Sequence, residues 1–299
     1  MKVIVVGSGG REAALVEVLA RTVEVVCTPG NPGIEESDPT PVEELVEAGD
    51  VDLVVIGPEQ PLVAGMADRL RARGVAVFGP GTDGALIEGS KAYMKDLVAE
   101  AGLPTARYGT FDDVETALGY LRMMPGPYVV KTDGLAAGKG VLVTDSLAEA
   151  EDDVRDKLSG ESFGDAGRRV VIEEALTGPE VSVFAICDGT RAICLPAAQD
   201  FKRLGDGDVG PNTGGMGAWS PLPFVDPALA DEVAKNFIEP TLEVLQRRGI
   251  DYRGVLYAGL MLTPEGPKLI EYNIRFGDPD AQVVLLRMTS DLAWLLMAA

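Results

Sequence analysis

Residues 129–141 read VVKTDGLAAGKGV, with two β-branched residues before Lys131 and a second apolar run directly after the loop. Thr-Asp-Ser at 144–146 interrupts the chain before a helix can begin, so the pattern predicts strand, glycine-rich loop, strand. Glycine amides can turn toward an anion, and lysines balance the charge of a polyphosphate. It is not a Walker A loop, because Gly140 follows Lys139 where that motif has Ser or Thr. Two interpretations stay open, a hairpin tip with solvated lysines and a lid over nucleotide phosphates.

The composition favours a cytoplasmic protein that acts on small molecules. The 299 residues are 46% hydrophobic, enough for two or three packed units, and no apolar run approaches the ~18 residues of a membrane span. The formal net charge of −21 should repel nucleic acid and anionic lipid, which excludes both as expected partners. An anionic ligand must therefore be held by a few local cations and backbone amides.

Histidine is absent and the three cysteines are widely spaced. The first fact excludes Ser-His-Asp and Cys-His catalysis as well as histidine metal sites. Cys27, Cys187 and Cys194 form no CxxC pair, so we expect small buried hydrophobes in a reducing compartment. Any chemistry must use carboxylates, lysine, arginine and backbone.

The first 80 residues alternate short apolar runs with helical segments, which is typical of a buried parallel sheet. The first turn, Gly7-Ser8-Gly9-Gly10, opens a helix but falls short of GxGxxG, because Glu12 occupies the place of the third glycine. No acidic residue follows the second strand, which argues against a dinucleotide site. A phosphate held by this turn and Arg11 remains open beside a purely structural turn.

A capped helix and, later in the chain, a long loop follow. Ser90 can cap a helix over 91–100, on which Lys91 and Lys95 share a face. Taken alone, that pair is expected to be solvated. Residues 199–217, QDFKRLGDGDVGPNTGGMG, show no periodicity, and a loop of this length within a compact protein is usually functional or disordered. Disorder is disfavoured because Phe201, Met216 and the nearby Trp219 are costly to leave in water.

The last predicted strand delivers Glu271, Asn273 and Arg275 on one face. Glu, Asn and Arg side by side cannot form a core face. A carboxylate, an amide oxygen and a cation pointing one way suit Mg²⁺ that bridges phosphates, with Arg275 to balance developing charge. This arrangement predicts a metal-assisted phosphoryl-transfer site.

Seven segments resemble the glycinamide ribonucleotide synthetase (phosphoribosylamine–glycine ligase) family of ATP-grasp ligases, in order and spacing. They are MKVIVVGSGGREAAL, IGPEQPLVAG, EGSKAYMKD, KTDGLAAGKGV, FGDAGRRVVIEE, GPNTGGMGAWSP and IEYNIRFGDPDAQ. The resemblance implies an α/β and α+β fold, with a parallel βα pre-ATP-grasp domain similar to the biotin carboxylase N-terminal domain over residues 1–90. A two-lobed ATP-grasp domain would follow over 91–299, with 121–180 as its mobile glycine-loop lobe.

The resemblance also implies the reaction and its residues. ATP would phosphorylate the carboxylate of glycine, and the amine of 5-phosphoribosylamine would displace phosphate. Metal ligands for Mg²⁺ or Mn²⁺ would be Glu271 and Asn273, and the catalytic residues would be Arg275, Lys139 and Asp278. The implied nucleotide-binding residues are Lys91, Lys131, Gly134, Gly138, Lys139, Gly140, Glu173, Glu174, Ala175, Leu176 and Glu180. The implied sugar-phosphate site comprises Gly9, Gly10, Arg11, Asp200, Lys202, Asn212, Thr213, Gly214, Gly215, Met216 and Gly217.

This sequence departs from the family pattern at several points. Ala13 and Phe201 stand where the family usually has histidine, and Asp280 replaces a glutamate. Family members continue into a further C-terminal domain, which is expected to be absent here. The apolar segment AQVVLLRMTSDLAWLLMAA is therefore expected to expose a patch that favours self-association. Two alternatives therefore stay open, an ATP-grasp ligase for another amino acid and amine, and a non-catalytic ATP-binding fragment.

Overall fold

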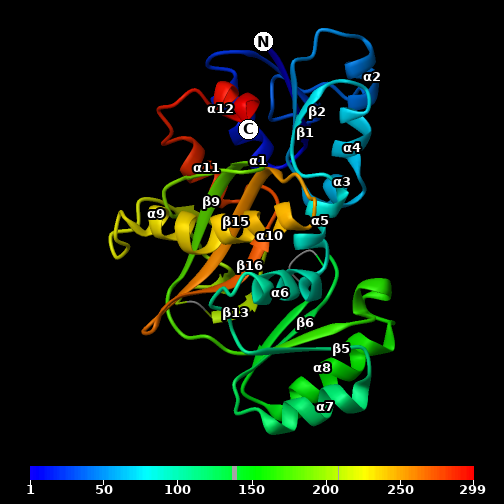
Figure 1. Ribbon diagram of the computed structural model, residues 1–299, viewed down its shortest axis with the longest axis vertical. Coiled ribbons are helices and arrows are strands. Elements are labelled where there is room, and N and C mark those ends of the chain that lie inside the picture. The colour runs from blue at the N-terminus through cyan, green and yellow to red at the C-terminus, as the bar shows by residue number, and fades with distance from the viewer. Residues whose placement is uncertain (137–139, 208) are drawn as a thin grey trace.

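The computed structural model describes residues 1–136, 140–207 and 209–299 of the chain. The N-terminal part forms one parallel sheet in the order β2-β1-β3-β4, flanked by helices (Figure 1). The alternation of short apolar runs with helical segments predicted this buried parallel sheet, and the structure confirms it. The elements are β1 (Lys2–Gly7), α1 (Gly10–Leu19), β2 (Glu24–Pro29), α2 (Val42–Glu47), β3 (Leu53–Ile56), α3 (Glu59–Val63), α4 (Met66–Arg71), β4 (Ala76–Phe78) and α5 (Thr82–Gly89).

A second unit carries the glycine-rich loop on an antiparallel sheet in the order β5-β8-β6-β7. Helices α7 and α8 pack on this sheet, and Figure 1 shows the unit in green at the end of the molecule opposite both termini. Strands β6 and β7 confirm the predicted hairpin, with Lys131 opposite Val141. The elements are α6 (Lys91–Glu100), β5 (Tyr108–Phe111), α7 (Val114–Met123), β6 (Tyr128–Thr132), β7 (Val141–Thr144), α8 (Leu147–Ser159), η1 (Gly164–Gly167) and β8 (Val170–Glu174).

The third unit is built on a long antiparallel sheet in the order β10-β9-β15-β16, with two short two-stranded sheets beside it. Its elements are β9 (Glu180–Asp188), β10 (Ala192–Cys194), β11 (Gln199–Asp200), β12 (Arg203–Gly205), β13 (Val209–Asn212), β14 (Ala218–Trp219), α9 (Leu229–Val233), η2 (Ala234–Ile238), α10 (Glu239–Arg247), β15 (Arg253–Thr263), β16 (Gly266–Asn273), α11 (Asp280–Leu285) and α12 (Leu292–Ala298). The long loop is therefore ordered by the β11–β14 and β12–β13 pairs.

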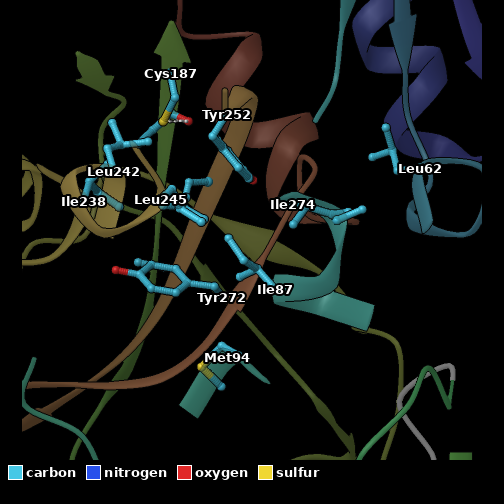
Figure 2. Close-up of a cluster of buried hydrophobic side chains, with 14 of the residues drawn as sticks. Leu62, Ile87, Met94, Cys187, Ile238, Leu242, Leu245, Tyr252, Tyr272 and Ile274 are labelled. Atoms are coloured by element: carbon cyan, nitrogen blue, oxygen red, sulfur yellow. Dashed lines mark hydrogen bonds between the residues drawn. The ribbon is translucent and has the colours of Figure 1, made fainter. Parts of the chain in front are cut away.

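One hydrophobic cluster joins the N-terminal part to the long antiparallel sheet. Figure 2 shows Leu62 and Ile87 from the N-terminal part together with Tyr252, Tyr272 and Ile274 around the long sheet. These side chains are each at most 2% exposed. The two parts are consequently packed together as one body. Burial of apolar surface stabilises this contact by about 25 cal/mol for each Å² removed from water.

The C-terminal helices pack back on the N-terminal part, where α11 and α12 contact α1 (Figure 1). Leu292 and Leu296 are buried in this contact, whereas Leu286 and Trp294 are 55% and 65% exposed. The terminal helix α12 therefore buries one face and leaves Trp294 exposed, while Leu286 is exposed at the end of α11. None of the helices in the described part of the chain is long and apolar enough to cross a bilayer.

Candidate functional site

The loops after β1 and β3 meet at one edge of the parallel sheet, because the carboxyl ends of neighbouring parallel strands lie together. The carboxylate of Glu12 fills this edge. It accepts a hydrogen bond from Gly9 N–H at 2.7 Å and one from Arg11 Nε at 2.6 Å. A Cβ on Gly57 would lie 2.0 Å from Glu12 Oε1, so any larger residue at position 57 would clash with this carboxylate. The turn thus has a structural use, and Glu12 already occupies its Gly9 amide.

Arg11 and the glycines of this turn meet the segment after β16. Arg11 Nη1 donates to the carbonyl of Phe276 at 3.2 Å. A Cβ on Gly9 would lie 3.3 Å from Asp278 Oδ2, and one on Gly10 would lie 2.8 Å from Gln282 Nε2. The glycines therefore permit close approach of the segment that carries Asp278. In this way residues more than 260 positions apart in sequence form one wall.

Arg275 lies in this wall between two glutamates of the N-terminal part. Its Nε is 3.2 Å from Glu59 Oε2 and its Nη2 is 3.1 Å from Glu88 Oε1. The prediction that residues 271, 273 and 275 share one strand face is wrong for Arg275, because β16 ends at Asn273 and Arg275 lies beyond the strand. The guanidinium still turns back, with Nη2 3.5 Å from Asn273 Oδ1.

A cavity of about 410 Å³ opens beside this arginine. A Cβ on Gly215 would lie 2.4 Å from Pro279 Cδ, so the loop over 212–217 packs directly on the segment after β16. Three distant parts of the chain thus share one cavity with two arginines and two carboxylates. Its lining residues are Arg11, Glu59, Gly214, Gly215, Arg275 and Asp278.

Three lysines of the site lie on β6 and α6. Lys131 Nζ is 3.2 Å from Glu173 Oε2, and Lys95 Nζ is 3.2 Å from Glu173 Oε1. The expectation that Lys95 is solvated is wrong: its side chain is 0% exposed, and burial lowers its pKa to about 8 even though Glu173 acts in the opposite direction. Lys91 Nζ donates to the carbonyl of Gly134 at 3.3 Å, which ties α6 to the glycine-rich loop.

Glu271 is the focus of the charged groups. Burial opposes its ionisation, but Lys202, Lys131, Lys91 and Arg275 together lower its pKa below the ordinary value. These four cations come from four separate parts of the sequence. A chain with a net charge of −21 therefore concentrates positive charge around one carboxylate. That is the electrostatic arrangement an anionic substrate requires.

Lys202 joins the two predicted sets of residues. Its Nζ contacts the carboxylate of Glu180, and although burial alone would lower the pKa of Lys202, Glu180 and other anionic groups raise it well above its usual value. Asp200, two residues earlier, has a pKa raised to about 6, chiefly by burial. Lys202, expected at the sugar-phosphate site, therefore contacts Glu180, which is expected among the nucleotide-binding residues.

The expected nucleotide-binding residues 173–176 span the end of β8. Glu173 and Glu174 lie within that strand, and Glu174 N–H donates to the carbonyl of Arg107, so their backbone groups serve the sheet. Ala175 and Leu176 lie beyond its end and line a cavity of about 280 Å³. Gly138 and Lys139 lie outside the described residues. Gly134 and Gly140 flank them, and the Gly140 carbonyl accepts from Thr132 N–H.

The structure thus brings most of the predicted residues into two connected clusters, one around Glu271 and one around the cavity beside Arg275. Asn212 and Met216 stay exposed on the loop above. Glu59, Glu88 and Lys95 were missed. The segment IGPEQPL could have pointed to Glu59, because it follows a predicted strand of the parallel sheet. Glu88 begins the segment EGSKAYMKD, which carries the family resemblance, but its spacing gives no indication of a contact with Arg275.

Comparison with known proteins gives a consistent result along the chain. The phosphoribosylglycinamide synthetase N-domain model matches residues 1–88, and the ATP-grasp (A) domain model of the same enzyme matches residues 89–281. The phosphoribosylamine–glycine ligase of Xanthomonas campestris pv. campestris is 50% identical, over 100% of this chain and 73% of that protein. The corresponding ligase of Brucella melitensis biotype 1 is 49% identical, with the same coverage.

Solved structures agree with these sequences. The crystal structure of phosphoribosylamine–glycine ligase from Thermotoga maritima superimposes with a TM-score of 0.83 at 36% identity, covering 96% of this chain and 72% of that one. The biotin carboxylase domain of the Hydrogenobacter thermophilus 2-oxoglutarate carboxylase shares the fold, with a TM-score of 0.76 at 16% identity over 99% of this chain and 68% of that one. The chain therefore belongs to the phosphoribosylamine–glycine ligase family of ATP-grasp enzymes.

Proposed function

We propose that this chain joins glycine to 5-phosphoribosylamine at the expense of ATP, giving glycinamide ribonucleotide, ADP and phosphate for purine biosynthesis. The observation that carries the proposal is the convergence of Lys91, Lys131, Lys202 and Arg275 on Glu271. Such a cluster matches a reaction in which negative charge moves between phosphoryl and carboxylate oxygens. Both substrates on the acceptor side are small and polar, which suits the open, charged cavity beside Arg275.

Membership of an ATP-grasp ligase family implies the use of ATP and a divalent metal. Lys91 and Lys131 are proposed to bind the phosphates, each through a charge-assisted contact. The peptide groups of Ala175 and Leu176 would read adenine from the hinge beyond β8, with Glu180 near the ribose. For Glu180 to reach a ribose hydroxyl, its contact with Lys202 must loosen or be shared.

The residues present fit a divalent metal held jointly by protein and phosphate. The described residues contain no group of three or more His, Cys, Asp or Glu side chains placed to hold an ion. Glu271, kept ionised by its cationic neighbours, and Asn273 supply two oxygen donors on one strand face. Mg²⁺ and Mn²⁺ both take oxygen ligands, and Mg²⁺ commonly binds through one or two carboxylates plus substrate phosphates. When bound, the metal would offset charge on the transferring phosphoryl group.

The acceptor side would use the cavity beside Arg275. There Arg11, Gly214 and Gly215 are proposed to face the sugar phosphate, with Asp278 beside them. A carboxylate oxygen of glycine attacks the terminal phosphorus of ATP and ADP leaves. The amine of phosphoribosylamine then forms the C–N bond, loses a proton and expels phosphate. Arg275 would stabilise the charge that develops in both steps.

An assay that couples ADP release to glycine and freshly made phosphoribosylamine tests this proposal. We expect ADP release that depends on both substrates and formation of one glycinamide ribonucleotide for each ADP. Turnover only with another amino acid or amine would favour the second candidate, which rests on Phe201 where the family usually has histidine. ATP binding without substrate-dependent ADP release would instead mark a non-catalytic fragment and would contradict the proposal.

A further inference from the structure

Glu88 makes two contacts with one short segment of the site. It lies on α5 in the N-terminal part, and its side chain is 9% exposed. Its Oε2 accepts a hydrogen bond from Ile274 N–H at 2.8 Å, and its Oε1 accepts from Arg275 Nη2 at 3.1 Å. One carboxylate thus holds both the backbone and the guanidinium directly after Asn273.

These two contacts help to fix the direction in which Arg275 points, together with the bonds from its Nε to Glu59 and from its Nη1 to the carbonyl of Phe276. Arginine has a long flexible stem, and a guanidinium held through a single nitrogen can still rotate. The bond to Ile274 N–H fixes the backbone from which the stem starts, and the bond to Nη2 fixes its far end. Nη2 is also the nitrogen that lies 3.5 Å from Asn273 Oδ1. The orientation of Arg275 is therefore tied to a proposed metal ligand.

The backbone on either side of the Glu88 contacts is held by packing in the hydrophobic core. Ile87 and Ile274 are each 1% exposed and belong to the cluster that joins the N-terminal part to the long sheet (Figure 2). Glu59 differs, because its side chain is 24% exposed and lines the cavity. The second glutamate on Arg275 can thus respond to a ligand, whereas Glu88 is held by packing.

We infer that Glu88 is a positioning residue for the phosphoryl-transfer reaction, which acts by holding Arg275 in its working orientation. The N-terminal part thereby contributes to chemistry on ATP as well as to the acceptor cavity. The inference rests on the role proposed above for Arg275. It assigns Glu88 no contact with any substrate.

Glu88→Gln separates positioning from structure. The glutamine carbonyl can still accept from Ile274 N–H, but the charged contact to Arg275 is lost. We expect kcat to fall by about 10–100-fold, the range typical for residues that orient an active-site group, with the KM for ATP unchanged within about twofold. The melting temperature should stay close to that of the parent chain. Glu151→Gln is the matched control, because Glu151 also accepts from arginine, on the glycine-loop unit, and its kcat should not change.

A double-mutant cycle with Arg275→Met tests whether Glu88 affects kcat through Arg275. If Glu88 acts through Arg275, adding Glu88→Gln to Arg275→Met lowers kcat no further. Loss of turnover in Arg275→Met with unchanged kcat in Glu88→Gln would overturn this inference and leave the proposed function intact. Unchanged kcat in Arg275→Met would instead overturn the proposed role of Arg275. Equal losses from Glu88→Gln in both backgrounds, or a variant that fails to fold, would also contradict the inference.

Discussion

Lys131 and Glu173 form a buried ion pair across two neighbouring strands, with 3.2 Å between Nζ and Oε2. The same carboxylate contacts Lys95, so one negative charge faces two lysines and one positive charge is left over. Lys131 is therefore held in place before any ligand arrives, on the strand that leads into the glycine-rich loop. Such preorganisation reduces the entropy lost when a phosphate binds.

The first prediction follows from this pair. Lys131→Ala should weaken ATP binding by about 10–150-fold, because a hydrogen bond to a charged group contributes ~1.5–3 kcal/mol. Calorimetric titration with ATP measures the change. Lys235→Ala removes the same charge from an exposed position and is the control. Equal ATP affinity in Lys131→Ala and the parent would show that this lysine serves only Glu173.

The second prediction concerns the metal. Glu271→Ala should lower kcat much more than it raises the KM for ATP, since it removes the carboxylate placed to fix the ion at the transferring group. Steady-state kinetics over a range of Mg²⁺ and Mn²⁺ concentrations would measure both. A near-parental kcat at ordinary Mg²⁺ would mean that the metal binds elsewhere.

The third prediction uses Asp200, whose pKa is raised to about 6 by burial. Its folded pKa exceeds the unfolded value of 3.8, so the stability that it contributes is full below pH 3.8 and is lost as pH rises through 6. Asp200→Asn should therefore melt at a higher temperature than the parent at pH 7.5. The free energy of unfolding should rise by about 1 kcal/mol, a value discounted for the partial exposure of Asp200. This increase should vanish near pH 4.

Melting curves at both pH values test this, with the exposed Asp206→Asn on the same loop as control. A less stable Asp200→Asn at pH 7.5 would show that its charge is needed beside Lys202.

The chain has no histidine, so no imidazole can shape the pH dependence of the rate near neutrality. We expect a broad activity plateau, limited on the acid side by carboxylates such as Asp200 and by protonation of the amine substrate.

The fourth prediction concerns a departure from the family pattern. Phe201 is 54% exposed, so its side chain is not held in the core of its own loop. Phe201→His should strengthen phosphoribosylamine binding several-fold without altering the KM for ATP, since a neutral hydrogen bond contributes ~0.5–1.5 kcal/mol. Leu204→His, at a similarly exposed position, is the control. A change in ATP affinity instead would place Phe201 on the nucleotide side.

Local patterns predicted the parallel sheet, the glycine-loop hairpin and the strand that carries Glu271, because each depends on periodicity and turn residues near in sequence. Lys95 was misjudged for the opposite reason. Its partner Glu173 is 78 residues later in the chain, and no local pattern shows that the two meet in the interior. The same holds for Glu88, which contacts Arg275 across 187 positions.

The pairing of cations with carboxylates in the site could likewise not be predicted from the sequence. The family resemblance implied separate nucleotide and sugar-phosphate sets, with Lys202 in the second. In the folded chain its ammonium group contacts Glu180, a member of the first set, and lies near Glu271. Residue types could be predicted from sequence, but which cation faces which carboxylate depends on how β9, β16 and the loop pack together.

Transfer of oxygen from glycine to phosphate tests the central claim most directly. Phosphorylation of the glycine carboxylate, followed by displacement by the amine, leaves one carboxylate oxygen on the phosphate that is released. With glycine labelled with ¹⁸O in its carboxylate, mass spectrometry should therefore find one labelled oxygen per phosphate in each turnover. Phosphate without label, alongside ADP release, would contradict the account, because ATP would then be cleaved without phosphorylating glycine.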